Sequence, residues 1–469
     1  MKETGIQFSL LGSYRNNSLF TTLPPEADIR TLETDSPLDT EACEKNIGLN
    51  IHEYIHQLHN FSTTSGLQLL KNRLAALQIF ATGTDDNGHY IRQGKIYKHL
   101  NKNILENFEK DYSRILGNTD KIDKWGNLSE FSFETTCYQE ETDDSSDPCT
   151  IIGVDAKFKL NGVEREAKIQ NIGYNIITEG IAYEIERQVR NSITGKSGIE
   201  LELATPPLPY RFYRPIVEHF VGRECSVPEL VKVGILALQN KIPSLGLFAA
   251  ASALREGGSV YSEFISNTIN EHNIVLAGYK ATIAELHEKA LAGTTLKDGL
   301  ILLDEIVMSA MNKREKDPFY ELLFLRETMT PEVFTHILRT EELPPRCILQ
   351  YKHDETAELY FIGQGVSDYS DTRVGAISTL QCALQFSTLH IAPNGSFNNT
   401  VRLQESPNKL ACPYLDACPL KDKRENQNLC SEAPWMHDLG IQTGDVCWYV
   451  NGVKSLRNLK FGDYDEQYV

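Results

Sequence analysis

The chain has 469 residues, of which 46 are basic and 64 acidic, so its formal net charge is −18. Hydrophobic residues make up 41% and charged residues 23%, the balance of a globular protein with a sizeable core, which excludes wholesale disorder. The acidic excess repels phosphate backbones and no dense run of lysine and arginine offsets it, so we expect no nucleic acid among its partners.

We expect neither a membrane anchor nor a secretory leader. Its longest strongly apolar run, residues 245–254, has about half the length that a membrane-spanning helix needs. The first residues soon become polar and lack the long apolar region of a signal peptide. The ten cysteines are scattered, unlike those of a small secreted disulfide scaffold. We therefore expect a cytoplasmic protein with no membrane partner.

The first half of the chain predicts helices followed by a small β region. Prolines make residues 1–40 irregular, and apolar stripes predict helices over 41–60, from Gly66 onward and over 92–116. Alternation predicts a strand over 131–135 and a hairpin over 155–170, with its turn at Asn161-Gly162. Residues 140–147 read as an exposed acidic loop, and a helix returns over 176–191.

The second half is predicted to be mostly helical. Helical patterns dominate from residue 206 to 339, and Pro344-Pro345 marks the next boundary. A strand over 359–362, a helix over 372–391 and an irregular cysteine-containing region follow. The fold class is therefore mainly α with a small β component (α+β). We divide the chain into a metal-binding core with inserted helices and a hairpin (1–205), a helical part (206–343) and a C-terminal region with a cysteine cluster (344–469).

The most specific motif lies in the first predicted helix, where His52-Glu53-Tyr54-Ile55-His56 forms an H-E-x-x-H set. Two histidines at i and i+4 project from one helix face and can bind one Zn²⁺ through their imidazole nitrogens. Glu53 lies beside them, where its carboxylate can accept a proton from a water that the metal activates. The alternative is that both histidines lie on a solvated helix face.

The same helix also carries half of a di-iron ligand pattern and a third histidine, His59. Glu53 and His56 form half of a di-iron ligand pattern, but no second Glu-x-x-His exists in the chain, which disfavours a di-iron site. His59 lies too far along the helix to join His52 and His56 on one ion. Contact with a ligand or substrate and plain surface exposure remain open for His59.

A catalytic zinc needs a third protein ligand and leaves one position for water. Glu179 is the preferred candidate, because it lies on a predicted helix whose other face carries the apolar stripe Ile177, Ile181, Ile185 and Val189. Glu256 is the rival. The alternative for Glu179 is an ordinary solvated carboxylate.

With these residues the sequence resembles the gluzincin-type zinc metallopeptidases, in which an H-E-x-x-H helix and a second helix bearing Glu, often in an E-G-x-A setting, bind zinc. The resemblance covers residues 52–56 and 179–182. It implies a zincin-like core with His52, His56 and Glu179 as ligands and Glu53 as general base. Residues 57–178 separate the two motifs, far more than is usual in that family, so they would hold a large helical insertion.

A developing oxyanion beside the metal needs a further hydrogen-bond donor. Tyr183 is our first choice, because it lies one turn from Glu179. Other chemically suitable side chains are Tyr210, Tyr213, His219 and Tyr261.

The last 60 residues contain a cysteine cluster. Cys412, Cys418, Cys430 and His437 predict a second, structural zinc, with Cys447 as an alternative ligand, since Cys/His clusters in a reducing compartment bind metal more often than they form disulfides. An iron–sulfur cluster and unligated thiols are the alternatives. The remaining cysteines are expected to be packing residues: Cys43, Cys137, Cys149, Cys225, Cys347 and Cys382.

We therefore expect an intracellular zinc metallopeptidase that hydrolyses peptide bonds with Glu53 as general base and Tyr183 as oxyanion donor. A peptide or protein substrate is implied by the family resemblance alone. Because a free intracellular protease is hazardous, we expect a regulatory partner, ligand or blocking segment to hold it inactive until triggered. The alternative is a non-catalytic regulatory or binding protein in which metal only stabilises the fold.

Overall fold

The structure is a computed structural model that describes residues 18–33, 39–83, 112–119, 126–140, 149–195, 202, 205–290, 296–340, 343–354, 356–362, 371–390, 411–418, 420, 428–437 and 447–457. In these ranges the chain is mostly helical and has two small sheets, of order β1-β6-β7 and β2-β5-β4-β3. The predicted α+β class is therefore confirmed.

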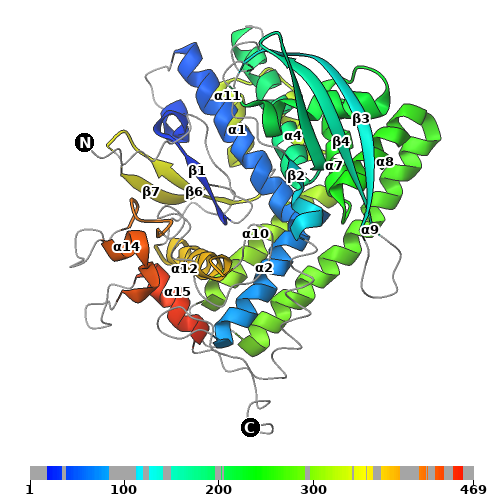
Figure 1. Cartoon of the computed structure of the whole chain (residues 1–469). Coiled ribbons are helices and arrows are strands. Elements are labelled where there is room, and N and C mark those ends of the chain that lie inside the picture. The colour runs from blue at the N-terminus through cyan, green and yellow to red at the C-terminus, as the bar shows by residue number, and fades with distance from the viewer. Residues whose placement is uncertain are drawn as a thin grey trace.

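Two antiparallel helices form the centre of the molecule: α1 (Thr40–Ser62) and α4 (Tyr174–Thr194) (Figure 1). Asp39 caps α1 by accepting a hydrogen bond from the backbone of Ala42. α4 ends at Gly195, whose φ of 64° suits glycine. The apolar stripes predicted for both helices are fully buried, so these helices form as their sequence periodicity indicates.

α1 is buried more completely than its apolar stripe predicts, since every residue from Asn46 to Ser62 is buried. Its polar side chains therefore bind neighbouring segments. Asn50 donates to the carbonyl of Ala27, and Tyr54 donates to the carbonyl of Pro344 over 2.7 Å. The predicted boundary at Pro344-Pro345 thus lies in direct contact with α1.

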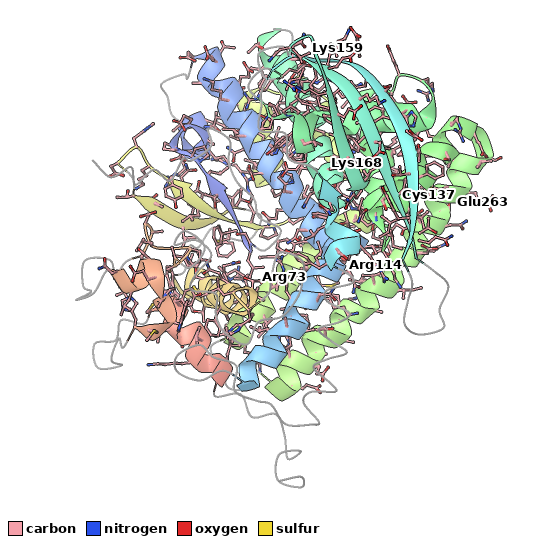
Figure 2. The ribbon with its side chains drawn as sticks, in the orientation of Figure 1. Arg73, Arg114, Cys137, Lys159, Lys168 and Glu263 are labelled. Carbon is pink, nitrogen blue, oxygen red and sulfur yellow. The ribbon has the colours of Figure 1, made fainter. Side chains whose placement is uncertain are left out.

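The four-stranded sheet precedes α4 and consists of β2 (Asn118–Thr119), β3 (Leu128–Glu140), β4 (Cys149–Leu160) and β5 (Val163–Asn171). The predicted hairpin is confirmed: Asn161 and Gly162, at φ 53° and 77°, turn β4 into β5. Lys159 and Lys168 lie on this sheet (Figure 2), while β4 contributes Val154 and Phe158 to the core. β5 leads directly into α4.

The second sheet joins distant parts of the chain and was only partly predicted. β1 (Phe20–Leu23) pairs in parallel with β6 (Arg346–Tyr351), which pairs antiparallel with β7 (Ala357–Ile362). The prediction that residues 1–40 are irregular is wrong at β1, and β6 was missed. β1 is too short for a clear alternation, and its partner lies more than 300 residues away, so no local pattern marks it.

The predicted helical stretch from 206 to 339 is confirmed. It contains α6 (Tyr213–Val221), α7 (Val227–Leu238), α8 (Pro243–Glu256), α9 (Gly258–Glu285), α10 (Leu296–Lys316) and α11 (Pro331–Arg339), besides the short helical turns η3 (Pro207–Arg211), η4 (Leu286–Ala290) and η5 (Tyr320–Leu325). Earlier in the chain, α2 (Thr64–Gly83) follows α1, and η1 (Pro25–Ala27) and η2 (Ile29–Glu33) follow β1.

The C-terminal part contains α12 (Asp371–Thr388), α14 (Asn428–Glu432), η7 (Pro434–Met436) and α15 (Trp448–Arg457). α12 and α15 pack against each other and against α2. Of the predicted helix over 92–116, only residues 112–116 are described, and they are helical. The acidic loop predicted over 140–147 lies outside the described residues except for Glu140, which ends β3. In the described part of the chain no helix is long and apolar enough to cross a membrane.

The contact of α4 with α6 depends on a glycine. A Cβ added at Gly180 would lie 2.1 Å from the Cβ of Tyr213, which leaves no room for a methyl group. We expect Gly180→Ala to lower the free energy of unfolding by about 1 to 3 kcal/mol, measured by denaturant unfolding. Gly278→Ala on α9 is the control, because its Cβ would meet only the end of Lys71 at 3.7 Å. It should be neutral or stabilising by up to about 1 kcal/mol. Equal effects of the two changes would contradict this account.

Candidate metal centre

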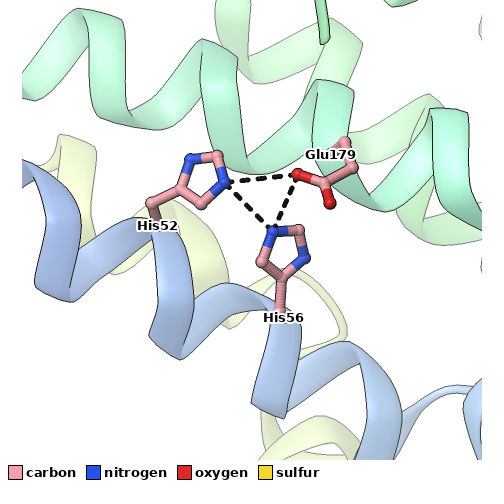
Figure 3. A group of neighbouring side chains, drawn as sticks. All are labelled: His52, His56 and Glu179. Carbon is pink, nitrogen blue, oxygen red and sulfur yellow. Dashed lines mark hydrogen bonds and ion pairs between the residues drawn. The ribbon is translucent and has the colours of Figure 1, made fainter. Parts of the chain in front are cut away.

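Three side chains converge between α1 and α4. Figure 3 shows His52 and His56 projecting from α1 toward Glu179 on α4. The Nε2 atoms of the two histidines are 3.0 Å apart, and the Oε2 atom of Glu179 lies 3.3 Å from His52 Nε2 and 3.0 Å from His56 Nε2. Within the described residues, this is the group whose three ligand atoms all lie within 4.8 Å of one another.

These separations fit a shared zinc ion. Zn–N and Zn–O bonds of about 2.0 to 2.1 Å at tetrahedral angles place ligand atoms about 3.3 Å apart. Three electron-pair donors gather at one point, where a cation relieves their mutual repulsion. His52, His56 and Glu179 can therefore hold a metal ion, as the sequence predicted, whereas Glu256 is exposed at the end of α8.

The group is open on one side. The side chains of His52 and His56 are 9% and 5% exposed, whereas that of Glu179 is 22% exposed. The interpretation that the histidines lie on a solvated face is therefore wrong. A metal held here would be accessible to solvent on the side of Glu179.

A second carboxylate orients His52. Glu186 lies two turns beyond Glu179 on α4, and its Oε2 atom is 2.8 Å from His52 Nδ1. Arg190 pairs with Glu186, and although burial raises the pKa of Glu186, Arg190 and His52 hold it down at about 2. A carboxylate on Nδ1 fixes the tautomer that leaves the Nε2 lone pair for a metal. Glu186 was not predicted as a site residue, because its partner His52 lies on a different helix and the contact is evident only when α1 and α4 pack together.

The electrostatics of His52 favour a cation. Burial lowers its pKa, but the carboxylates of Glu179 and Glu186 outweigh burial and raise the pKa to about 10. For Glu179 the directions are reversed: burial raises its pKa, but His56 and His52 outweigh burial and bring the pKa below its usual range. The negative potential of these carboxylates, which favours protonation of His52, also favours the binding of a metal cation by the three ligand atoms.

His56 is held by a chain of polar groups that ends at a buried ion pair. Thr178 Oγ1 lies 3.1 Å from His56 Nδ1 and 2.6 Å from His59 Nδ1, and His59 Nε2 is 3.5 Å from Glu321 Oε1. Glu321 in turn pairs with Arg314. Burial lowers the pKa of His59 to about 4, so its ring is neutral.

That neutral ring sets the direction of the hydrogen bonds. His56 Nδ1 donates to Thr178 Oγ1, the Thr178 hydroxyl donates to His59 Nδ1, and the protonated Nε2 of His59 faces Glu321. The Nε2 lone pair of His56 is thereby left for a metal. His59 is fully buried, so surface exposure, one of the alternatives for it, is wrong.

Glu53 lies beside the ligands but is not one of them. It is 2% exposed, and its Oε2 atom has no hydrogen-bond partner among the described residues. Burial raises its pKa to about 8, with His52 and the buried guanidinium of Arg346 opposing the rise. A carboxylate that titrates near neutral pH and has a free oxygen is suited to proton transfer.

Tyr210, not Tyr183, lies against the candidate metal centre. Its ring centroid is 5.9 Å from that of His52, and burial and the carboxylates of Glu179 and Glu53 raise the pKa of its hydroxyl, which stays protonated. The Tyr183 hydroxyl has no hydrogen-bond partner among the described residues, and its strongest electrostatic neighbours are Glu202 and Arg187.

The other suitable donors are engaged or distant. The Tyr213 hydroxyl donates to the carbonyl of Leu230, and His219 Nε2 lies 3.1 Å from Thr135 Oγ1. The hydroxyl of Tyr261 is electrostatically coupled to Glu229 and Cys225, not to the candidate ligands.

The predicted cysteine site lies elsewhere, near α12 and α15. Cys430 Sγ contacts His437 Nε2 at 2.9 Å, and both side chains are buried. Cys412 and Cys447 belong to the same apolar core, against which Cys418 packs. Cys149 has no described side chain.

Comparison with known proteins identifies no relative: no family model, curated protein or solved structure matches the chain.

The contact of Glu186 with His52 predicts a loss of metal affinity in Glu186→Gln. An amide cannot hold the Nδ1 proton of His52 as a carboxylate does, so we expect zinc to bind about 10- to 100-fold more weakly in competition with a chromophoric chelator. Glu184→Gln is the matched control, because Glu184 is equally buried on α4 but pairs with Arg187 and Arg214. Similar losses in both variants would argue that general destabilisation is the cause.

Proposed function

We propose that this chain is a zinc-dependent metallopeptidase whose centre is formed by His52, His56 and Glu179. The observation that carries the proposal is the convergence of three ligand atoms, 3.0 to 3.3 Å apart, beside a buried carboxylate with a free oxygen. A purely structural zinc site has four protein ligands and no neighbouring base. This group has three, and it is partly open at Glu179.

The donor set fits zinc, since two imidazole nitrogens and one carboxylate oxygen are a common catalytic ligand set for that ion. A bound Zn²⁺ supplies Lewis acidity, polarising a carbonyl and lowering the pKa of water at its open position. The protein supplies the orientation of the ligands through Glu186 and Thr178.

Glu53 acts as the general base in this proposal. Its carboxylate accepts a proton from the attacking water and passes it to the leaving amine nitrogen as the peptide bond breaks. A nearby cation lowers the pKa of Glu53 from about 8, so that it is ionised at neutral pH. Arg346, whose pKa burial lowers to about 10, remains charged and favours the ionised form.

Tyr210 is the oxyanion donor in this proposal, in place of Tyr183. Its ring lies 5.9 Å from that of His52, its hydroxyl is protonated and electrostatically coupled to Glu179 and Glu53, and its side chain is only partly buried. A preformed donor at the position where charge develops stabilises the transition state more than the bound substrate.

The peptide substrate and the zincin-like core come from the resemblance of residues 52–56 and 179–182 to gluzincins. Restraint by a partner, ligand or blocking segment also stays a proposal. In the alternative, a non-catalytic binding protein, the metal would stabilise the contact of α1 with α4 and Glu53 would have no chemical role.

Glu53→Gln separates these two functions. Removing the base should lower peptide hydrolysis at least about 100-fold while zinc stays bound, because the amide cannot accept the proton and Glu53 is not a ligand. Hydrolysis of a quenched fluorescent peptide library and zinc content by mass spectrometry are the measurements. Glu184→Gln should keep full activity. Hydrolysis that is unchanged in Glu53→Gln would refute the peptidase.

Tyr210→Phe tests the oxyanion donor. Loss of one donor should lower kcat about 100-fold with little change in KM, since the hydrogen bond forms in the transition state. Tyr183→Phe on α4 should retain nearly full kcat. The reverse result would return the role to Tyr183.

A further inference from the structure

Four separate segments bring thiols together in the C-terminal part of the molecule. Cysteines lie on α12, in the turns at 411–418, on α14 and directly before α15, and Figure 1 shows α12, α14 and α15 as neighbours. Buried cysteines of three of these segments lie in a single apolar core: Cys382, Cys412 and Cys447. This region is remote from the candidate catalytic centre between α1 and α4 (Figure 1).

Two pairs of neighbouring residues can be recognised. Cys430 Sγ is 2.9 Å from His437 Nε2, and the backbone N–H of Cys412 donates to the carbonyl of Cys430 over 2.7 Å, so these residues are held next to one another. The thiol of Cys382 is buried in the same apolar core as that of Cys412 and interacts with it electrostatically. Burial raises the pKa of the Cys382 thiol, as do the neighbouring thiols of Cys412, Cys447 and Cys418.

Such a cluster is unusual for packing cysteines. Cys382 and Cys430 are 0% and 1% exposed, and His437 is 6% exposed, so the Cys430–His437 pair and the Cys382 thiol are all shielded from water. A buried imidazole in contact with a thiol, with further buried cysteines nearby, matches the residue types of a structural zinc site.

We propose that Cys382, Cys412, Cys430 and His437 bind a second, structural Zn²⁺. Cys382 on α12, which the sequence analysis assigned to packing, replaces Cys418 of the predicted ligand set, because Cys418 is partly exposed. No three of these ligand atoms lie within 4.8 Å of one another in the described part of the chain. Side-chain rotation must therefore bring the two pairs together as the ion binds.

This ion would link α12 to the segments around Cys412 and Cys430. α12 packs against α15, α10 and α2, so a metal anchored on Cys382 ties irregular chain to the helical core. Zinc binding then contributes directly to the stability of the C-terminal region.

The test is zinc content per chain in the full-length protein. His56→Ala should retain one zinc, and His56→Ala combined with Cys382→Ser should retain none, which separates this site from the catalytic one. Cys418→Ser should leave the second zinc bound. Cys347→Ser is the matched control, since Cys347 is as buried as Cys382 and lies in the same core. It should also keep the ion.

Cobalt substitution distinguishes a lost ligand from a damaged fold. With Co²⁺ in the His56→Ala background, the thiolate-to-metal absorption should fall by about one third in Cys382→Ser if cobalt remains bound, as three thiolates become two. An unchanged spectrum, or zinc loss in Cys418→Ser but not in Cys382→Ser, would overturn the ligand set.

A thiol titration of the native protein gives an independent check. Exposed Cys137 on β3, far from α12 and α15 (Figures 1 and 2), should react at once, whereas Cys382, Cys412 and Cys430 should react only after zinc is chelated. A Cys382–Cys412 disulfide, or rapid reaction before chelation, would contradict the metal site.

Discussion

Antiparallel packing of α1 against α4 is the contact on which the rest of the candidate catalytic centre depends. Gly48 gives the side chain of Arg190 room to lie against α1, and one turn further along α1 His52 meets Glu186. A further turn places His56 beside Thr178 and Glu179. The i, i+4 spacing on α1 therefore matches successive positions on α4 running in the opposite direction, which positions every ligand from a single helix pair.

This interface buries more negative charge than an ordinary helix contact tolerates. Glu53, Glu179 and Glu186 all lie close to His52, and each loses hydration. Arg190 compensates Glu186, while Glu179 pairs with the two imidazoles. A divalent cation at the three ligand atoms would compensate this charge, and its binding would then be thermodynamically linked to the stability of the α1–α4 pair.

What the sequence could predict depends on how local each signal is. The stripes of α1 and α4 and the turn at Asn161-Gly162 are encoded within a few residues, and all three are confirmed. Glu179 was found because its helix could be read from its own periodicity. The positions of Glu186, Tyr210 and Cys382 could not be read in this way, since their partners lie on other elements, and the same holds for the pairing of β1 with β6.

The two groups of metal-ligating residues differ in a way that bears on their chemistry. Around His52 the ligands are two imidazoles and one carboxylate, the last partly exposed, with an ionisable Glu53 beside them. Around Cys430 the candidate ligands are mainly thiols, and the buried carboxylates of the described residues lie elsewhere, on α1, α4 and η5. An ion held by four buried protein ligands has no position for water and no base to accept a proton, so it can only stabilise the fold. If both proposed sites bind metal, we therefore expect chemistry at the α1–α4 interface and a purely structural role for the ion near Cys430.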